Sequence, residues 1–344
     1  MVGRPRRHHT VLRLLAALLA SVLAAPVRSD QRVMVFAPHP DDEMLCCAGV
    51  LEQALQRHDP VRIVVMTCGD AYQSCFRSFV QNHPDLAQDQ DGNGSFDLKD
   101  FGYLRHQESL AAADRLGLSS DDVVFLGYPD EGLLPMWSGE GRYTSRQTNA
   151  DAVYYPFALR PGAPFRRREC LDDVRALIRD FAPTVVYTPR PEEWHPDHVA
   201  TYRFVDEALQ GLAASGLRPD HQLYLVHWEH VEHGWPGPPL QSYHYPTGLE
   251  KPTADIALAS DGYSAELKRQ LLLLYFTQTR PDWRDHDFLL GFAKNDEIFW
   301  DQGPAAGGCG CRQAPDAASG GQALVPICIS ILRRRKASLC DCRK

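Results

Sequence analysis

The sequence predicts an α/β fold: a Rossmann-like, mainly parallel sheet with helices on both faces. Two observations predict it. Short apolar runs rich in β-branched residues alternate with stretches of helical spacing between residues 31 and 302. In addition, clusters of histidine and carboxylate residues directly follow two of these apolar runs. Parallel strands end at one edge of an open sheet, where sites are usually built, so the clusters fit the same fold.

The expected elements follow the chain as alternating strands and helices. The expected strands cover residues 33–37, 61–67, 123–126, 184–188 and 223–228. The expected helices cover residues 44–57, 103–116, 171–180, 199–212 and 265–277. Gly117 and Pro183 mark the ends of two of these helices. No repeat or linker divides this region, so we expect one domain over residues 30–302.

The N-terminal end is expected to lie outside this domain. Residues 1–29 carry a basic start, an apolar run and small residues before Asp30, which is typical of a secretory signal peptide. A retained membrane anchor is the alternative, but the apolar run is shorter than the roughly 20 residues that span a bilayer. We therefore expect an exported protein, periplasmic, on the cell surface or secreted, without a stable transmembrane span in its mature form.

The C-terminal end, residues 303–344, has the composition of a low-complexity tail. Gly, Ala and Pro are frequent in residues 303–321, and a short apolar run then meets the basic residues 333–336. The order of cysteine, apolar run and basic cluster resembles a C-terminal sorting tag. A disordered basic tail is the alternative.

Charge and cysteine content narrow the classes of partner and site. The net charge is −8, which implies no broad basic surface, so nucleic acid is not an expected partner. Among the ten cysteines no Cys-x-x-Cys pair occurs, so a structural zinc ribbon is not expected. Cys68 and Cys75 are close enough in sequence to form a disulfide in an oxidising compartment. Cys46 and Cys47 are interpreted as small buried residues of a helix.

The first cluster, His39-Pro-Asp-Asp-Glu43, follows the first expected strand. A hydrolytic zinc site needs about three protein ligands, an open position for water, and a base for the water's proton. His39 and Asp42 lie on one strand-to-helix turn, so both can face one ion. Asp41 lies between them and can face the water. Acidic residues at a helix start are also favourable without any function, which is the structural alternative.

The second cluster, His195-Pro-Asp-His198, follows a later expected strand. His198 can supply the remaining ligand, because ends of parallel strands share an edge of the sheet. His195 is placed to donate to an oxyanion or a leaving group. Asp197 can orient an imidazole from behind. A His-Pro turn element is the structural alternative, but two such clusters at strand ends favour a metal-assisted hydrolase.

These motifs resemble the PIG-L/LmbE family of zinc-dependent de-N-acetylases. Besides the two histidine clusters, the similar segments are Arg105-His-Gln-Glu108, Leu126-Gly-Tyr-Pro-Asp130 and residues 268–278. The resemblance spans roughly residues 32–278. Some members place a tyrosine just before the second cluster as an oxyanion donor, whereas this chain has Glu193 and Trp194 there. Tyr128 and Tyr187 are the candidates for a substitute.

The resemblance implies an enzyme and roles for its residues. The implied zinc ligands are His39, Asp42 and His198, and the implied catalytic residues are Asp41 as base and His195 as stabiliser or proton donor. Asp197 is expected as a further catalytic residue from its position, because it can orient an imidazole. Arg105 and Asp130 are implied as substrate contacts. The implied reaction hydrolyses an acetamide on a small molecule or glycan, typically an N-acetylglucosaminyl group, releasing acetate and an amine. The alternatives are a metal-dependent amidase for a non-sugar acyl amide, and a non-catalytic carbohydrate- or calcium-binding surface protein.

A second metal signal lies in residues 89–100. Their spacing fits the calcium loop of an EF-hand, with a glycine at the sharp turn and an aspartate at the last position, where a glutamate is usual. The expected calcium ligands are Asp89, Asp91, Asn93, Ser95, Asp97 and Asp100. Such a loop would make an insertion near the site more rigid. A polar surface loop that binds nothing is the alternative.

Other histidines and aromatic residues receive weaker interpretations. Histidines 227, 230 and 233 are expected as rim residues without a metal role. Tyr275, Trp283 and Trp300 are expected in the core rather than as sugar-stacking surfaces. The sequence does not indicate an oligomeric state.

Overall fold

The computed structural model describes residues 31–228, 234–246, 248–257 and 265–304. The expected signal peptide, histidines 230 and 233, and the tail from residue 305 onward lie outside the described residues.

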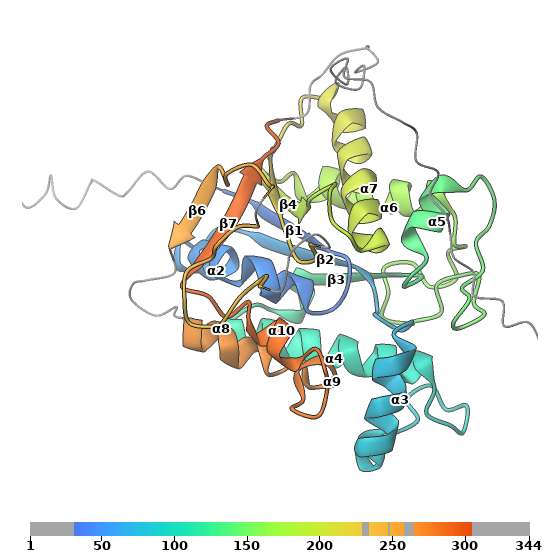
Figure 1. Cartoon of the computed structure of the whole chain (residues 1–344). Coiled ribbons are helices and arrows are strands. Elements are labelled where there is room, and N and C mark those ends of the chain that lie inside the picture. Colours follow the sequence, from blue (N-terminus) through green and yellow to red (C-terminus); the bar gives the residue numbers. More distant parts are fainter. Residues whose placement is uncertain (1–30, 229–233, 247, 258–264, 305–344) are drawn as a thin grey trace, which may run out of the picture. The chain divides into compact units, whose positions relative to one another are not determined.

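Seven strands form one sheet, in the order β3-β2-β1-β4-β5-β7-β6 (Figure 1). Their bounds are β1 Val33–Ala37, β2 Val61–Thr67, β3 Val123–Tyr128, β4 Val185–Pro189, β5 Asp220–Tyr224, β6 Ala254–Ala257 and β7 Asp296–Asp301. Strands β1 to β5 pair in parallel, whereas β7 runs antiparallel to β5 and β6. The predicted mainly parallel α/β fold is therefore confirmed.

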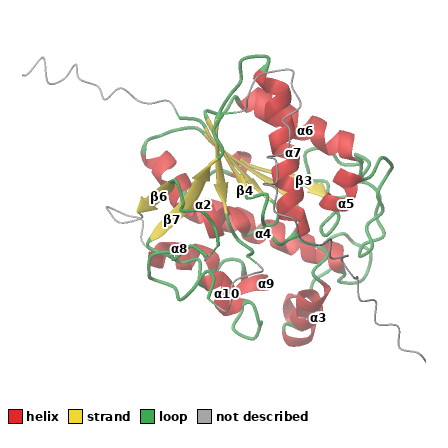
Figure 2. Ribbon diagram, turned by 45° about the horizontal axis from the view of Figure 1, so that its top comes forward, coloured by secondary structure: helices red, strands yellow, loops and turns green. Residues whose placement is uncertain are grey.

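Helices cover both faces of the sheet, as Figure 2 shows. The helices are α2 Asp42–Gln56, α3 Gln73–Asn82, α4 Leu98–Leu116, α5 Leu133–Ser138, α6 Arg167–Phe181, α7 Pro196–Ala213, α8 Ala265–Leu272, α9 Phe276–Thr279 and α10 His286–Leu290. Two short 3₁₀ helices lie at Pro84–Leu86 and Ser120–Asp122. Helix α2 packs on the sheet together with α4 and α8, while α5, α6 and α7 pack together on the other face. None of the helices described is long and apolar enough to cross a membrane.

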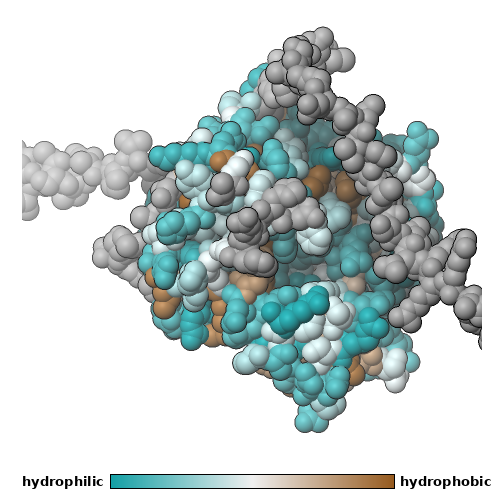
Figure 3. Space-filling model, in the orientation of Figure 1, coloured by the Kyte–Doolittle hydropathy of each residue, from teal (hydrophilic) through white to brown (hydrophobic). Residues whose placement is uncertain are grey.

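The most apolar segments of the sequence form the core. All five residues of β1 are buried, as expected for a central parallel strand covered on both faces. Helix α2 is buried around most of its circumference, and Cys46 and Cys47 lie in this core as predicted. Tyr275, Trp283 and Trp300 are also buried, which confirms their core interpretation. The surface in Figure 3 is mostly hydrophilic, and its apolar side chains lie in separate small patches.

Several expectations are corrected by the structure. The proposed disulfide between Cys68 and Cys75 is wrong: both thiols are free and buried, and the Cys75 Sγ donates to the carbonyl of Thr277 at 3.2 Å. Helix α4 begins five residues earlier than expected, because Asp97 caps it and exchanges hydrogen bonds with Asp100. The expected helix over residues 265–277 breaks into α8 and α9, and β5 ends at Tyr224. Strands β6 and β7 were not expected.

The strand order determines where a site can form. The chain passes from β1 to β2 and β3 on one side, and later to β4 on the other side of β1. The loops after β1 and β4 therefore diverge from a topological switch point, which is the usual place for a ligand in an open α/β sheet.

Candidate metal and catalytic site

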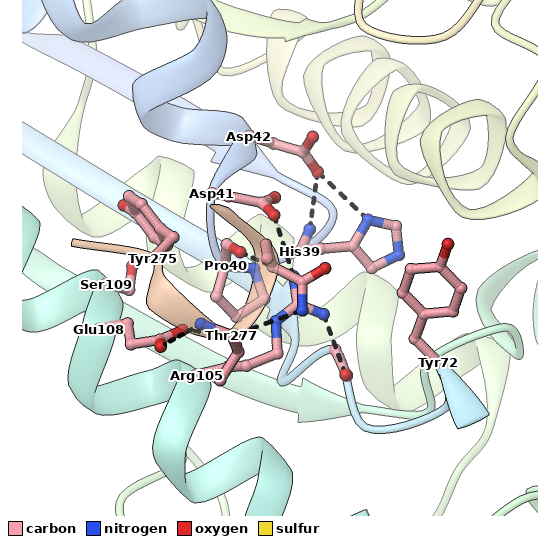
Figure 4. Close-up of polar contacts among 12 residues, drawn as sticks. His39, Pro40, Asp41, Asp42, Tyr72, Arg105, Glu108, Ser109, Tyr275 and Thr277 are labelled. Atoms are coloured by element: carbon pink, nitrogen blue, oxygen red, sulfur yellow. Dashed lines mark hydrogen bonds and ion pairs between the residues drawn. The ribbon is translucent and has the colours of Figure 1, made fainter. Parts of the chain in front are cut away.

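Both histidine clusters meet at this switch point. The ring centroid of His39 lies 4.8 Å from that of His195 and 5.3 Å from that of His198. His39, Asp41 and Asp42 lie on the turn from β1 into α2 (Figure 4). His195 and His198 lie at the start of α7, after β4. The two clusters are 156 residues apart in sequence, counted from His39 to His195, and the structure brings them together as predicted.

Asp42 lies between the two histidines that were predicted as its fellow ligands. Its Oδ2 atom lies 3.2 Å from Nδ1 of His39 and 3.3 Å from Nε2 of His198. Burial alone would raise the pKa of Asp42, but His198 and His39 hold it well below its ordinary value. A carboxylate that stays ionised beside two imidazoles is a donor set that zinc favours.

The other nitrogen of His39 faces two buried carboxylates. Its Nε2 atom lies 3.2 Å from Oδ1 of Asp130 and 3.5 Å from Oδ2 of Asp197. Acceptors on this side favour a proton on Nε2, which leaves the lone pair of Nδ1 directed toward Asp42. Asp197 thus lies where an orienting carboxylate was predicted. Asp130, predicted as a substrate contact, lies behind His39 and is 5% exposed.

His198 provides the clearest indication that a cation belongs here. It is fully buried, and its Nε2 atom makes no hydrogen bond although it points at Asp42. Its Nδ1 atom faces Glu193, with Oε1 at 3.7 Å. A buried polar atom without a hydrogen bond is costly unless another ligand satisfies it. His39, His195 and His198 also offer ring nitrogens within 4.8 Å of one another, so the residues fit a metal ion.

Asp41 has an unusual backbone conformation next to these ligands. Its φ of 135° is rare for a residue with a side chain. Glu43 fixes this conformation, because its Oε2 atom accepts from the Asp41 N–H at 3.0 Å. The Oε1 atom of Glu43 accepts from the hydroxyls of Ser109 and Tyr275, so this carboxylate is itself fixed from α4 and from the segment after α8.

Arg105 holds the side chain of Asp41 from below, as Figure 4 shows. Its guanidinium donates to Oδ2 of Asp41 at 3.1 Å and to the carbonyls of Pro40 and Gly69 at 2.8 and 2.9 Å. Burial raises the pKa of Asp41 to about 8, although Arg105 acts against the shift. Predicted as a substrate contact, Arg105 is instead buried beneath the site, where it connects the loops after β1 and β2.

His195 is only partly buried and lies at the edge of the cluster. Its Nδ1 atom accepts from the N–H of Asp197 at 3.3 Å, so a neutral ring carries its proton on Nε2. Burial and the neighbouring His39 and His198 lower the pKa of His195 well below its ordinary value. A neutral imidazole with one free N–H matches the predicted role as a donor.

Glu193 and His227 are parts of the site whose roles sequence reasoning missed. Glu193 is buried and accepts from the N–H groups of Val226 and His227, the latter at 2.6 Å. The His227 ring thereby lies 4.9 Å from that of His198. The only sequence signal for Glu193 was that it replaces the tyrosine expected before the second cluster. Neither Tyr128 nor Tyr187 takes the place of that missing tyrosine. The hydroxyl of Tyr128 donates to Asp173 at 2.7 Å, and the ring of Tyr187 packs against Phe299.

The residues of the predicted calcium loop are only partly gathered. Asp89, Asp91 and Asp100 offer carboxylate oxygens within 4.8 Å of one another. Asp97 instead caps α4, and Asn93 hydrogen-bonds to Ser95 and Asp97. The buried Asp100 accepts from the N–H groups of Gln90 and Asp91 at 2.7 and 3.1 Å. Calcium binding by this loop stays a prediction.

Comparison with known proteins gives a family match over the region that holds this site. The sequence model of the PIG-L family, described as GlcNAc-PI de-N-acetylase, matches residues 34–209. A 1D-myo-inositol 2-acetamido-2-deoxy-alpha-D-glucopyranoside deacetylase of Mycobacterium sp. (strain KMS) is 30% identical over 204 residues, which are 57% of this chain and 56% of that protein. A probable N-acetyl-alpha-D-glucosaminyl L-malate deacetylase 2 of Bacillus anthracis is 25% identical over 53% of this chain and 61% of that protein. The chain thus spans less than two thirds of the length of these curated relatives.

A solved structure of a deacetylase also resembles the chain, at low sequence identity. The N,N'-diacetylchitobiose deacetylase from Pyrococcus horikoshii is 17% identical, covers 88% of this chain and 95% of its own, and gives a TM-score of 0.48.

Proposed function

The chain belongs to the PIG-L family, and on that premise we propose that it is a zinc-dependent hydrolase that removes the acetyl group from an N-acetylglucosaminyl-type substrate. The observation that carries the proposal is the position of Asp42, whose Oδ2 atom lies within 3.3 Å of His39 Nδ1 and His198 Nε2. His39, Asp42 and His198 would hold the metal.

A zinc ion held there would polarise an amide carbonyl and lower the pKa of a coordinated water to about 7. Asp41, next to Asp42 in the same turn, would accept a proton on its carboxylate. Arg105 acts against the rise in the pKa of Asp41 that burial causes, and a cation bound beside this carboxylate would further favour the ionised form that a base needs. Arg105 and Glu43 keep that carboxylate and its backbone in place.

The remaining residues hold or supply protons. His195 would donate from Nε2 to the oxygen that becomes negative as the amide carbon becomes tetrahedral. Asp130 and Asp197, which face Nε2 of His39 at 3.2 and 3.5 Å, would favour a proton on that nitrogen and leave Nδ1 available as a ligand once a metal ion is bound. The amine leaves only when its nitrogen is protonated, a step for which Asp41 carries the proton.

Zinc content and acetate release, measured on the same preparations, test this proposal. We expect Asp41→Asn to keep its zinc while its kcat falls by about 10²–10⁴-fold, the usual effect of losing an acid–base group. We expect His198→Ala to lose zinc and acetate release together. The exposed Asp121 and His244 provide control variants with the same substitutions, D121N and H244A.

Two results would contradict the assignment. Full acetate release by Asp41→Asn would contradict its role as base, and unchanged zinc content in His198→Ala would contradict its role as a ligand.

An amidase for non-sugar acyl amides, the first alternative, would hydrolyse simple acyl amides better than N-acetylglucosaminyl compounds. A preparation that binds calcium but no transition metal would favour the non-catalytic alternative.

A further inference from the structure

We propose that Glu193 is a positioning residue of the metal site: a buried carboxylate that acts on His198 from behind and strengthens its hold on the metal ion. The inference rests on the proposed function, because it concerns the same metal site. It adds a residue that sets the affinity for the ion, not one that contacts the substrate.

The two ring nitrogens of His198 face two different carboxylates. Nε2 lies 3.3 Å from Oδ2 of Asp42, the fellow ligand, whereas Nδ1 lies 3.7 Å from Oε1 of Glu193. The exposed fractions of the His198, Asp42 and Glu193 side chains are 0%, 2% and 0%. A neutral imidazole that offers the lone pair of Nε2 carries its proton on Nδ1. Glu193 therefore faces the N–H group of the tautomer that metal binding requires.

The carboxylate of Glu193 acts on His198 through its charge. The separation of 3.7 Å is longer than a hydrogen bond, and Nδ1 has no hydrogen-bond partner. Both side chains are withdrawn from water, and charges interact more strongly where water is excluded. A negative charge behind Nδ1 makes the imidazole more basic and favours a cation at Nε2.

Backbone contacts hold this carboxylate in its position. Its Oε1 and Oε2 atoms accept from the N–H groups of Val226 and His227, the latter at 2.6 Å. The neighbouring Trp194 attaches the same loop, because its N–H donates to the carbonyl of His227 at 3.2 Å. Glu193 can turn away from His198 only if its two hydrogen bonds break.

Another buried glutamate shows what such a carboxylate requires. Glu297 also accepts from two successive backbone N–H groups, in α2, at 2.9 and 3.1 Å, and it accepts from the ammonium group of Lys268 at 2.7 Å. Burying a charge is costly unless an opposite charge accompanies it. Glu193 has the same pair of N–H contacts, and His198 lies where Glu297 has its cation. A metal ion on His198 would supply that positive charge.

Two variants separate the charge of Glu193 from its hydrogen bonds. Glu193→Gln removes the charge but keeps an oxygen acceptor, whereas Glu193→Asp keeps the charge on a shorter side chain. We expect the Kd for zinc, measured by competition with a chromogenic chelator, to rise about 10–100-fold in Glu193→Gln, the usual effect of losing such a partner. We expect a smaller rise in Glu193→Asp. A carboxylate that only anchors the backbone predicts the reverse order, because the shorter side chain reaches the N–H groups less well.

Co²⁺ in place of zinc gives a second readout, since its visible absorption reports on the ligands. We expect the absorption bands to shift in Glu193→Gln and to match wild type in Glu297→Gln. The latter is the matched control, because it also replaces a buried glutamate that accepts from two backbone N–H groups. Thermal unfolding of the metal-free proteins shows which variants fold. If Glu193→Gln does not, a zinc Kd and Co²⁺ absorption identical to wild type in Glu193→Asp would overturn the inference.

The outcomes for the inference and for the proposed function can be told apart. An unchanged zinc Kd in Glu193→Gln, or an equal rise in Glu297→Gln, would overturn the role of Glu193 even if wild type releases acetate as proposed. If wild type releases no acetate from N-acetylglucosamine but Glu193→Gln weakens zinc binding, the proposed function fails and the role of Glu193 stands. Zinc binding that is equal in wild type and His198→Ala would overturn both.

Discussion

Asp41 combines the proposed catalytic carboxylate with a strained backbone, at a φ of 135°. Such a conformation costs of the order of 1–3 kcal/mol for a residue with a side chain. The N–H groups of Met44 and Leu45 both donate to the Asp41 carbonyl at 2.9 Å, so the start of α2 stabilises it together with Glu43 and Arg105. The surrounding contacts thus hold both the backbone of Asp41 and its carboxylate in one position beside Asp42.

Gly69 is the residue on which the position of Arg105 depends. It has a φ of 64°, and a Cβ atom there would lie 1.8 Å from a guanidinium nitrogen of Arg105. We therefore expect Gly69→Ala to displace Arg105 and release Asp41, with a fall in kcat of at least about tenfold and a lower melting temperature. Acetate-release kinetics and thermal unfolding measure the two effects.

Gly162→Ala separates backbone strain from the clash with Arg105. Gly162 has a φ of 84°, and nothing lies within 4 Å of a Cβ atom at that position. Its replacement should cost only the strain of a left-handed alanine, on the order of 1 kcal/mol, and should leave kcat intact. If the two variants have the same kcat, Arg105 does not control the position of Asp41.

The sequence predicted site residues that belong to short local motifs, and it missed those that act from a distance. The convergence of His39, Asp42 and His198 was predictable because residues that follow neighbouring parallel strands meet at one edge of the sheet. The positions of Arg105 and Asp130 beneath and behind the site were not, because a sequence does not show which way a buried polar side chain points. The sequence shows only that Glu193 stands where a tyrosine was expected, and it does not show the role of Glu193, since its partners are N–H groups more than thirty residues away.

Among the secondary-structure elements, strand β7 could not be predicted from its own sequence. It begins with Asp296 and Glu297, which are unfavourable in a strand judged by its own sequence. Glu297 is buried and accepts from Lys268 at 2.7 Å and from the N–H groups of Gly49 and Val50 at 2.9 and 3.1 Å. These contacts compensate the burial of the carboxylate and bind β7 to α2 and α8. Strands β1 to β4, by contrast, have apolar runs that were recognisable locally, whereas β5 begins with three polar residues and was expected three residues later.

The buried His221 on strand β5 makes the stability of the fold depend on pH. This imidazole is 2% exposed, its Nε2 atom lies 2.8 Å from the hydroxyl oxygen of Thr188, and burial lowers its pKa to about 4. The unfolded chain has a pKa near ~6.5 at this position and so binds more protons below that pH. The stabilisation that comes from keeping His221 neutral in the fold is complete above about pH 6.5. It is lost as the pH falls toward 4, and the unfolding free energy then decreases by on the order of 3 kcal/mol.

Denaturant unfolding at pH 7 and pH 5 measures this dependence. We expect wild type to lose more of its unfolding free energy between the two values than His221→Gln, whose amide cannot take up a proton. The exposed His244→Gln reports the background effect of such a substitution. Equal losses in wild type and His221→Gln would show that this buried imidazole does not contribute to acid sensitivity.

In the whole molecule, the strand order brings the two histidine clusters to the same place. β1 and β4 are neighbours although most of the domain's first half separates them in the chain, and their two loops supply all the proposed metal ligands. A metal ion would therefore connect the two halves of the parallel sheet. Binding that requires the folded arrangement must stabilise the fold, because the unfolded chain has no such site.

We accordingly expect removal of zinc by a chelator to lower the melting temperature, and its return to restore it. At a free zinc concentration of 100 times Kd the stabilisation is about 2.7 kcal/mol, which corresponds to several degrees for a domain of this size. His198→Ala should abolish the zinc-dependent shift, because it removes a ligand. Asp41→Asn should retain it, because Asp41 is held by Arg105 and is not among the ligands. A zinc-dependent shift of equal size in His198→Ala would place the stabilising ion outside this site, even if acetate release were lost.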